Sequence, residues 1–80
     1  MASRITIRQV EAFRLLMTSG TMTEAAERMS ISQPAVSRLI SDLEATLDMR
    51  LFERSGPRLQ ATPAASRLVG EVNRVFVGLD

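Results

Sequence analysis

Residues 23–40 read TEAAERMSISQPAVSRLI, and this stretch decides the predicted fold. It encodes two short helices joined by a tight polar turn at residues 30–32, with Ile31 expected to plug the core. The second helix opens with Gln33 and other small or hydrogen-bonding side chains, followed by Arg38. Such a helix start suits entry into the major groove of DNA. The stretch therefore predicts a helix-turn-helix that reads a DNA sequence.

The composition excludes most catalytic chemistry. The chain has 80 residues, which predicts one small domain, and it contains neither cysteine nor histidine. The commonest general base and metal ligands are therefore missing, and we expect no enzyme activity, no metal site and no cofactor in this chain. Acids such as Asp42 and Glu44 are expected on the exposed flank of a helix. No apolar run approaches the ~18 residues that cross a bilayer, and no signal peptide is evident, so we expect a soluble cytoplasmic protein without a membrane partner.

Charge is segregated along the chain although the formal net charge is only +1. All ten basic residues are arginine. Three of them and one acid lie within residues 50–58, whereas three acids and one arginine lie within residues 11–27. A contact with a polyanion on one side of the domain requires such a distribution.

Apolar spacing predicts the surrounding helices. Before the central stretch, Thr6 caps a helix whose apolar face is formed by Ile7, Val10, Phe13 and Met17. Thr21 and Thr23 both offer a hydroxyl cap to the next helix, and Ser32 caps the third with Pro34 in its first turn. The third helix has a buried stripe formed by Val36, Leu39, Ile40, Leu43 and Leu47.

After the third helix, the spacing of apolar residues changes from a helical period to one typical of a strand. Residues 49–52 and 58–61 flank Ser55-Gly56-Pro57, which predicts a short two-stranded hairpin. An isolated hairpin is barely stable, so Leu51, Phe52 and Leu59 are expected to pack on the helices as a wing.

Thr62-Pro63 is a cap followed by proline at the first position of a last, long helix. Its apolar residues recur at three and four positions, which predicts a dimerisation seam formed by Ala65, Leu68, Val72, Val75 and Leu79. The alternative is that this helix lies back on its own domain.

The whole pattern resembles the N-terminal winged helix-turn-helix domain of LysR-type transcriptional regulators. The resemblance is carried by residues 7–13, 25–29, 32–38, Leu43-Glu44, 51–54 and 62–64. Within the family, residues 8–14 and 74–79 look like regulators of opine catabolism. The family often has glycine where this chain has Asp48, a residue that tolerates the left-handed conformation better than most. The resemblance implies a mainly α fold of three helices and a two-stranded wing over residues 1–62, and a linker helix over residues 63–80.

The predicted site combines chemistry and resemblance. Base contacts are expected from Gln33, Pro34, Ser37 and Arg38, since arginine pairs with guanine and glutamine with adenine through two hydrogen bonds each. Contacts with the DNA backbone or minor groove are expected from Thr23, Ser32, Arg50, Arg54 and Arg58. The alternatives are that Gln33 and Arg38 are only solvated, that the hydroxyls only cap helices, and that Arg54 forms a surface ion pair with Glu53 or a neighbour.

The resemblance also implies partners. Two linker helices would pair antiparallel in a homodimer, whose two-fold axis matches an inverted-repeat operator in double-stranded DNA. A tetramer is expected in the full-length protein. An effector-binding domain that takes a small-molecule inducer would follow residue 80. A helical module that binds protein rather than DNA is the alternative, favoured by the near-neutral charge.

Overall fold

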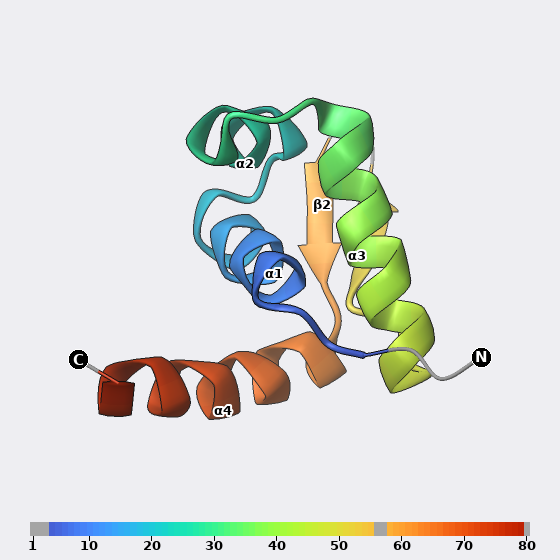
Figure 1. Ribbon diagram of the computed structural model, residues 1–80. Helices are drawn as coiled ribbons and strands as arrows, with labels where there is room; N and C mark the ends of the chain where they lie inside the picture. Colours follow the sequence, from blue (N-terminus) through green and yellow to red (C-terminus); the bar gives the residue numbers. More distant parts are fainter. Residues whose placement is uncertain (1–3, 56–57, 80) are drawn as a thin grey trace.

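The computed structural model describes residues 4–55 and 58–79, with side chains described for residues 4–54 and 58–74. The elements follow the order α1 (Ile7–Ser19), α2 (Met22–Met29), α3 (Gln33–Leu47), β1 (Phe52–Ser55), β2 (Arg58–Ala61) and α4 (Pro63–Leu79). The first three helices pack around one core, the wing lies beside α3, and α4 runs beneath α1 and projects away from α3 (Figure 1). The predicted mainly α, winged helix-turn-helix fold is confirmed.

The first helix begins as predicted, but the face that it buries overlaps the predicted face only in part. Thr6 and Gln9 form a reciprocal capping box, with Gln9 N–H donating to Thr6 Oγ1 over 3.1 Å and Thr6 N–H donating to Gln9 Oε1 over 3.0 Å. The buried residues are Gln9, Ala12, Phe13 and Leu16. The predicted face was therefore wrong at Ile7, which is 71% exposed, because the docking of α1 on α2 and α3 turns this position to solvent.

The turn between α2 and α3 depends on one left-handed residue. Thr21, not Thr23, is the N-cap of α2 and accepts from Glu24 N–H over 3.2 Å. Ser30 ends α2 with φ 57°, and Ile31 N–H then donates to Ala26 O over 3.0 Å. Ser32 caps α3 by accepting from Ala35 N–H over 3.2 Å, as predicted. This tight turn sets α3 across α2 with its first residues on the outside.

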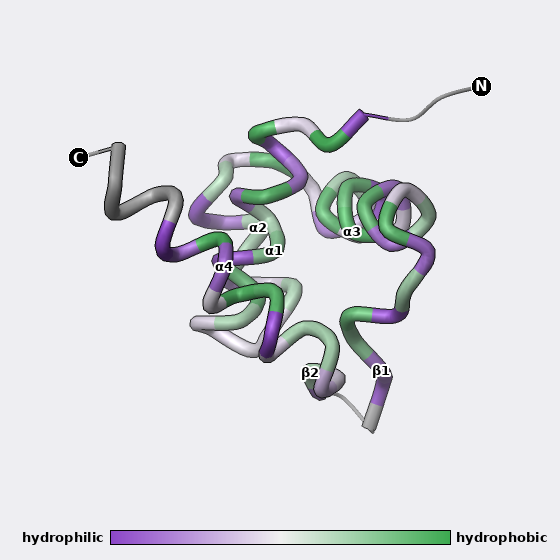
Figure 2. The backbone as a smooth tube through the Cα atoms, turned by 90° about the horizontal axis from the view of Figure 1, so that it is seen from below, coloured by the Kyte–Doolittle hydropathy of each residue, from purple (hydrophilic) through white to green (hydrophobic). Residues whose placement is uncertain are grey.

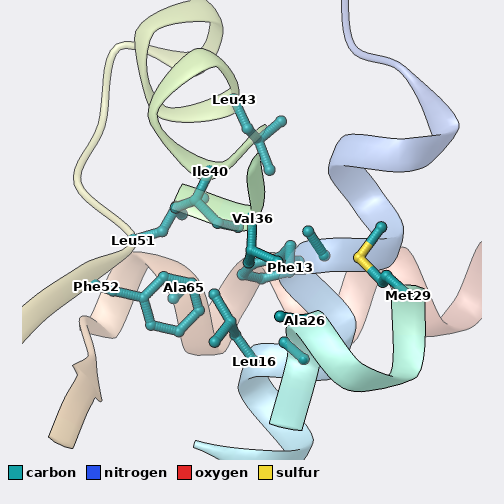
Figure 3. Packing of buried hydrophobic residues seen from close by; sticks show 12 residues of the cluster. Phe13, Leu16, Ala26, Met29, Val36, Ile40, Leu43, Leu51, Phe52 and Ala65 are labelled. Atoms are coloured by element: carbon teal, nitrogen blue, oxygen red, sulfur yellow. The ribbon is translucent and has the colours of Figure 1, made fainter. Parts of the chain in front are cut away.

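The core joins all the elements. Ala12, Phe13, Ala25, Val36 and Leu51 have no exposed surface, and Figure 3 shows side chains from the helices and the wing root meeting there. The Phe13 and Phe52 rings lie 6.0 Å apart with a tilt of 57°. Tilted aromatic pairs add to the stabilisation gained from area alone. The wing is therefore fastened to the three-helix core through its first strand.

The wing begins later than predicted. Asp48 ends α3 in the left-handed conformation with φ 54°, as its chemistry allows, and residues 49–51 form a connecting segment. The first strand begins only at Phe52, which corrects the predicted strand at residues 49–52. In the antiparallel register Phe52 pairs with Ala61 and Arg54 with Leu59.

The last helix begins at the wing. Thr62 Oγ1 accepts from Ala65 N–H over 3.1 Å, which confirms the predicted cap. Apolar and polar residues alternate along α4 (Figure 2), and Ala65 is fully buried against the core. Among the described residues, no helix is long and apolar enough to cross a membrane.

Candidate nucleic-acid interface

One side of α3 is buried and the other carries the predicted reading residues. Its buried stripe contains Val36, Ile40 and Leu43. Four exposed residues share the opposite side of the first turns: Gln33, Pro34, Ser37 and Arg38. We call these four residues the reading strip. The structure brings all four together at the outer end of α3, with none of them committed to the core.

A hydrogen bond connects the reading strip with the start of α2. Gln33 Nε2 donates to Thr23 Oγ1 over 3.1 Å, although the two residues are ten positions apart. The second amide hydrogen and Oε1 of Gln33 stay available, so the side chain still presents the donor and acceptor that match adenine. The Thr23 hydroxyl keeps its own hydrogen, which it can donate to a phosphate oxygen. The bond therefore orients Gln33 without using up its recognition groups.

Arg38 supplies the charge of the reading strip and is strongly exposed. Its side chain is 81% exposed, and Nε lies 3.6 Å from Asp42 Oδ2 on the next turn. A surface pair with this i,i+4 spacing contributes little to stability and is readily exchanged for another anion or for a base edge. Arg38 is thus held near the helix but remains accessible to DNA.

The wing forms the second side of a groove next to the reading strip. Arg54 in β1 lines a groove together with Met22, Gln33, Pro34 and Ser37. A neighbouring groove is lined by Arg50 and Arg54 with Ser37, Ser41 and Glu44 among its other residues. Arg54 therefore faces the reading strip rather than only the wing tip.

The alternative for Arg54 does not occur in the part of the chain that the structure describes. Successive residues of a strand point to opposite faces, so Glu53 is turned away from Arg54, and no ion pair joins them among the described residues. Arg58 is exposed at the start of β2 and lies outside both groove linings. Ser32 is exposed and serves as the cap of α3.

Glu44 makes contacts with the start of the wing that the sequence did not predict. It is half-buried rather than on the exposed flank, and its Oε2 accepts from Leu51 N–H over 2.8 Å and Phe52 N–H over 3.3 Å. The helical period alone places Glu44 beside the buried Leu43 and Ile40, which was the available signal. Its partners follow seven and eight residues later and were not predictable from spacing.

The residues of the predicted dimerisation seam lie in different environments in the structure. Ala65 is fully buried in its own domain, so it is best explained as the residue that anchors α4. Leu68 and Val72 are half-buried and pack partly against the same core. Val75 and Leu79 lie in α4, but their side chains are outside the described residues. Arg14 Nε also donates to Asn73 Oδ1 over 3.0 Å, which joins α1 to α4.

Together, a helix-turn-helix with an exposed reading strip and an arginine-bearing wing define a winged helix-turn-helix domain. Residues 7–66 match the family model described as the bacterial regulatory helix-turn-helix protein, lysR family. The chain therefore belongs to the LysR family of bacterial regulators.

Relatives and solved structures agree with this assignment. The octopine catabolism/uptake operon regulatory protein OccR of Rhizobium meliloti is 53% identical over 74 residues, which cover 92% of this chain and 25% of OccR. The complex of the BenM DBD with benA site 1 DNA is similar with a TM-score of 0.86 and 27% identity, covering 94% of this chain and 87% of that one. The CbnR DBD–DNA complex has a TM-score of 0.83 and 32% identity, covering 89% and 82%. The chain spans about a quarter of the length of OccR.

Proposed function

We propose that this chain binds double-stranded DNA sequence-specifically as the reading domain of a LysR-type transcription regulator. The observation that carries the proposal is the exposed reading strip on α3, with Arg54 across a shared groove. Similarity to the BenM and CbnR domains in their DNA complexes supports it. The assigned role is binding rather than catalysis, in keeping with relatives that are named as regulators.

In this mechanism the N-terminal end of α3 enters the major groove. Arg38 leaves Asp42 and chelates a guanine, Gln33 pairs with an adenine, and Ser37 lets the backbone come close. Pro34 offers an apolar surface to a thymine methyl group. Thr23 donates to a phosphate at the start of α2, where the free backbone N–H groups also favour an anion. Arg54 and Arg58 of the wing, and Arg50 in the segment before it, contact the flanking backbone or the minor groove.

We further propose that the working unit is a homodimer formed through α4. Leu68 and Val72 keep part of their surface exposed, and the helix projects beyond the body of the domain (Figure 1). Pairing around a two-fold axis would present two reading strips to an inverted repeat. A small-molecule inducer and a tetrameric assembly would involve residues other than the 80 of this chain, and the likeness to OccR supports an opine-related operon as the target.

Selection from random DNA tests the proposal. A library of duplexes is enriched on the purified chain, and the selected duplex is titrated by fluorescence anisotropy at two salt concentrations. Enrichment of a dyad-symmetric site is expected, with log K falling by about 0.9 for each phosphate neutralised per decade of salt. No enrichment, together with no binding at low salt, would refute DNA reading and favour a protein-binding module.

A further inference from the structure

The carboxylate of Glu44 holds the root of the wing. Its Oε2 accepts hydrogen bonds from two successive backbone N–H groups, those of Leu51 at 2.8 Å and Phe52 at 3.3 Å. Hydrogen bonds to an ionised acceptor are stronger than neutral ones. One side-chain atom of the recognition helix α3 therefore fixes the point at which β1 begins.

The same segment is held from its other side as well. The Leu51 side chain is fully buried, and the Leu51 carbonyl accepts from Thr62 N–H over 3.0 Å. Arg54 follows two residues after Phe52 in the same strand, at ~3.3 Å per residue. With its root held from both sides and its strand paired, Arg54 takes a defined position across the groove from Ser37, to which the two Glu44 hydrogen bonds contribute.

The negative charge of Glu44 is unfavourable for DNA binding at this place, so another reason for its presence is needed. The groove that it lines also contains Arg50 and Arg54, and a DNA phosphate approaching these arginines would be repelled by a carboxylate. For binding a polyanion, a neutral residue at this position would be the better electrostatic choice. The two backbone hydrogen bonds supply the reason for a side-chain acceptor oxygen at this reach, whatever its charge.

We propose that Glu44 is a positioning residue for DNA recognition: through the backbone of Leu51 and Phe52 it sets where Arg54 meets the DNA relative to the reading strip. The proposal rests on the DNA-binding function proposed above. It assigns Glu44 no contact with DNA. Its effect on binding passes through Arg54.

Two substitutions distinguish the effect of the side-chain length of Glu44 from the effect of its charge. Glu44→Asp keeps the charge but shortens the side chain by one methylene, so the contacts with Leu51 and Phe52 N–H are lost. Glu44→Gln removes the charge but keeps an oxygen at the same reach. We expect E44D to weaken operator binding by about tenfold and E44Q to leave it within about threefold of the unchanged chain, or to tighten it. Glu53→Gln is the matched control, because it removes an exposed wing charge that has no such contacts.

A double-mutant cycle with Arg54→Ala tests whether Glu44 affects DNA binding through Arg54. R54A is expected to weaken operator binding by about tenfold in the unchanged chain but by less than about threefold in the E44D background. In that background Arg54 is already displaced from its DNA contact, so its removal takes away little binding free energy. Equal losses in both backgrounds would overturn the proposal, as would full-strength binding by E44D. Tighter binding by E44D would also overturn it.

Amide hydrogen exchange provides a readout that needs no DNA. In E44D, the Leu51 and Phe52 amides should exchange about tenfold faster, whereas amides in the middle of α1 should keep their protection. Unchanged exchange at Leu51 and Phe52 would refute the anchoring role itself. If the unchanged chain selected no DNA while these amides responded as expected, the anchor would stand, but both the proposed function and the role of Glu44 in recognition would fail.

Discussion

Replacing Thr62 with alanine should measure how firmly the wing and the linker helix are joined. Its hydroxyl has two tasks: it accepts from Ala65 N–H over 3.1 Å, which caps α4, and it donates to Arg50 O over 2.7 Å. Loss of a helix N-cap costs about 1 kcal/mol. Loss of one further hydrogen bond costs about 1 kcal/mol. Because Thr62 is half-buried, water only partly replaces the missing partner, and we expect Thr62→Ala to lower the free energy of unfolding by about 2 kcal/mol.

Such a loss is large for a domain of this size. Eighty residues correspond to a total stability of about 4–12 kcal/mol, and a loss of about 2 kcal/mol lowers Tm by roughly 8–16 °C. The chain contains no tryptophan or tyrosine, so urea and thermal unfolding are best followed by far-ultraviolet circular dichroism. Thr62→Ser keeps the hydroxyl and is the matched control. A loss below about 0.5 kcal/mol for T62A, or equal losses for T62S and T62A, would show that the hydroxyl does not hold this joint.

Three further predictions concern α4 and the reading strip. Gly70→Ala should raise the free energy of unfolding by up to about 1 kcal/mol, because Gly70 is exposed inside α4 and an added Cβ would meet no atom within 4 Å; an unchanged or lower Tm would contradict this. Thr23→Ala should relax the base preference at the position read by Gln33. Thr18→Ala, which removes another exposed hydrogen bond of a threonine hydroxyl, should not. Equal effects of the two substitutions in sequence selection would argue against the Thr23 contact. Arg38→Ala should weaken binding to the selected operator by about 1–3 kcal/mol and relax discrimination at one base pair, and unchanged discrimination against scrambled DNA would remove its reading role.

The elements of the fold were largely predictable because local chemistry determines them. Ser32 and Thr62 cap the helices that follow them, and Asp48 adopts the left-handed conformation that its position requires. The apolar stripe of α3 also follows directly from its period. On α1, however, Phe13 belongs to two overlapping stripes, and only the packing of α1 against the other helices decides that Ile7 is exposed.

The sequence predicts where the candidate site residues lie on α3 but not how they are connected to the rest of the fold. The helical period puts Gln33, Ser37 and Arg38 on one exposed side of α3. The contact between Thr23 and Gln33 depends on how the turn at Ser30 sets the two helices, and a periodicity argument does not contain that angle. The start of the wing likewise depends on a hydrogen bond over seven residues, from Leu51 N–H to the Glu44 carboxylate, and strand propensity alone placed it too early.

The exposure of the reading strip separates the proposed specificity of the domain from its stability. Gln33, Ser37 and Arg38 are exposed and lie outside the buried cluster that holds the helices together, and exposed substitutions of this kind usually change stability by less than about 0.5 kcal/mol. If the strip reads bases as proposed, successive substitutions at these positions will alter the preferred operator while the scaffold stays intact. For evolution this means that duplicated copies of such a gene can diverge toward new promoters one base pair at a time. For engineering it means that a library restricted to these three positions samples new operators with nearly every member folded.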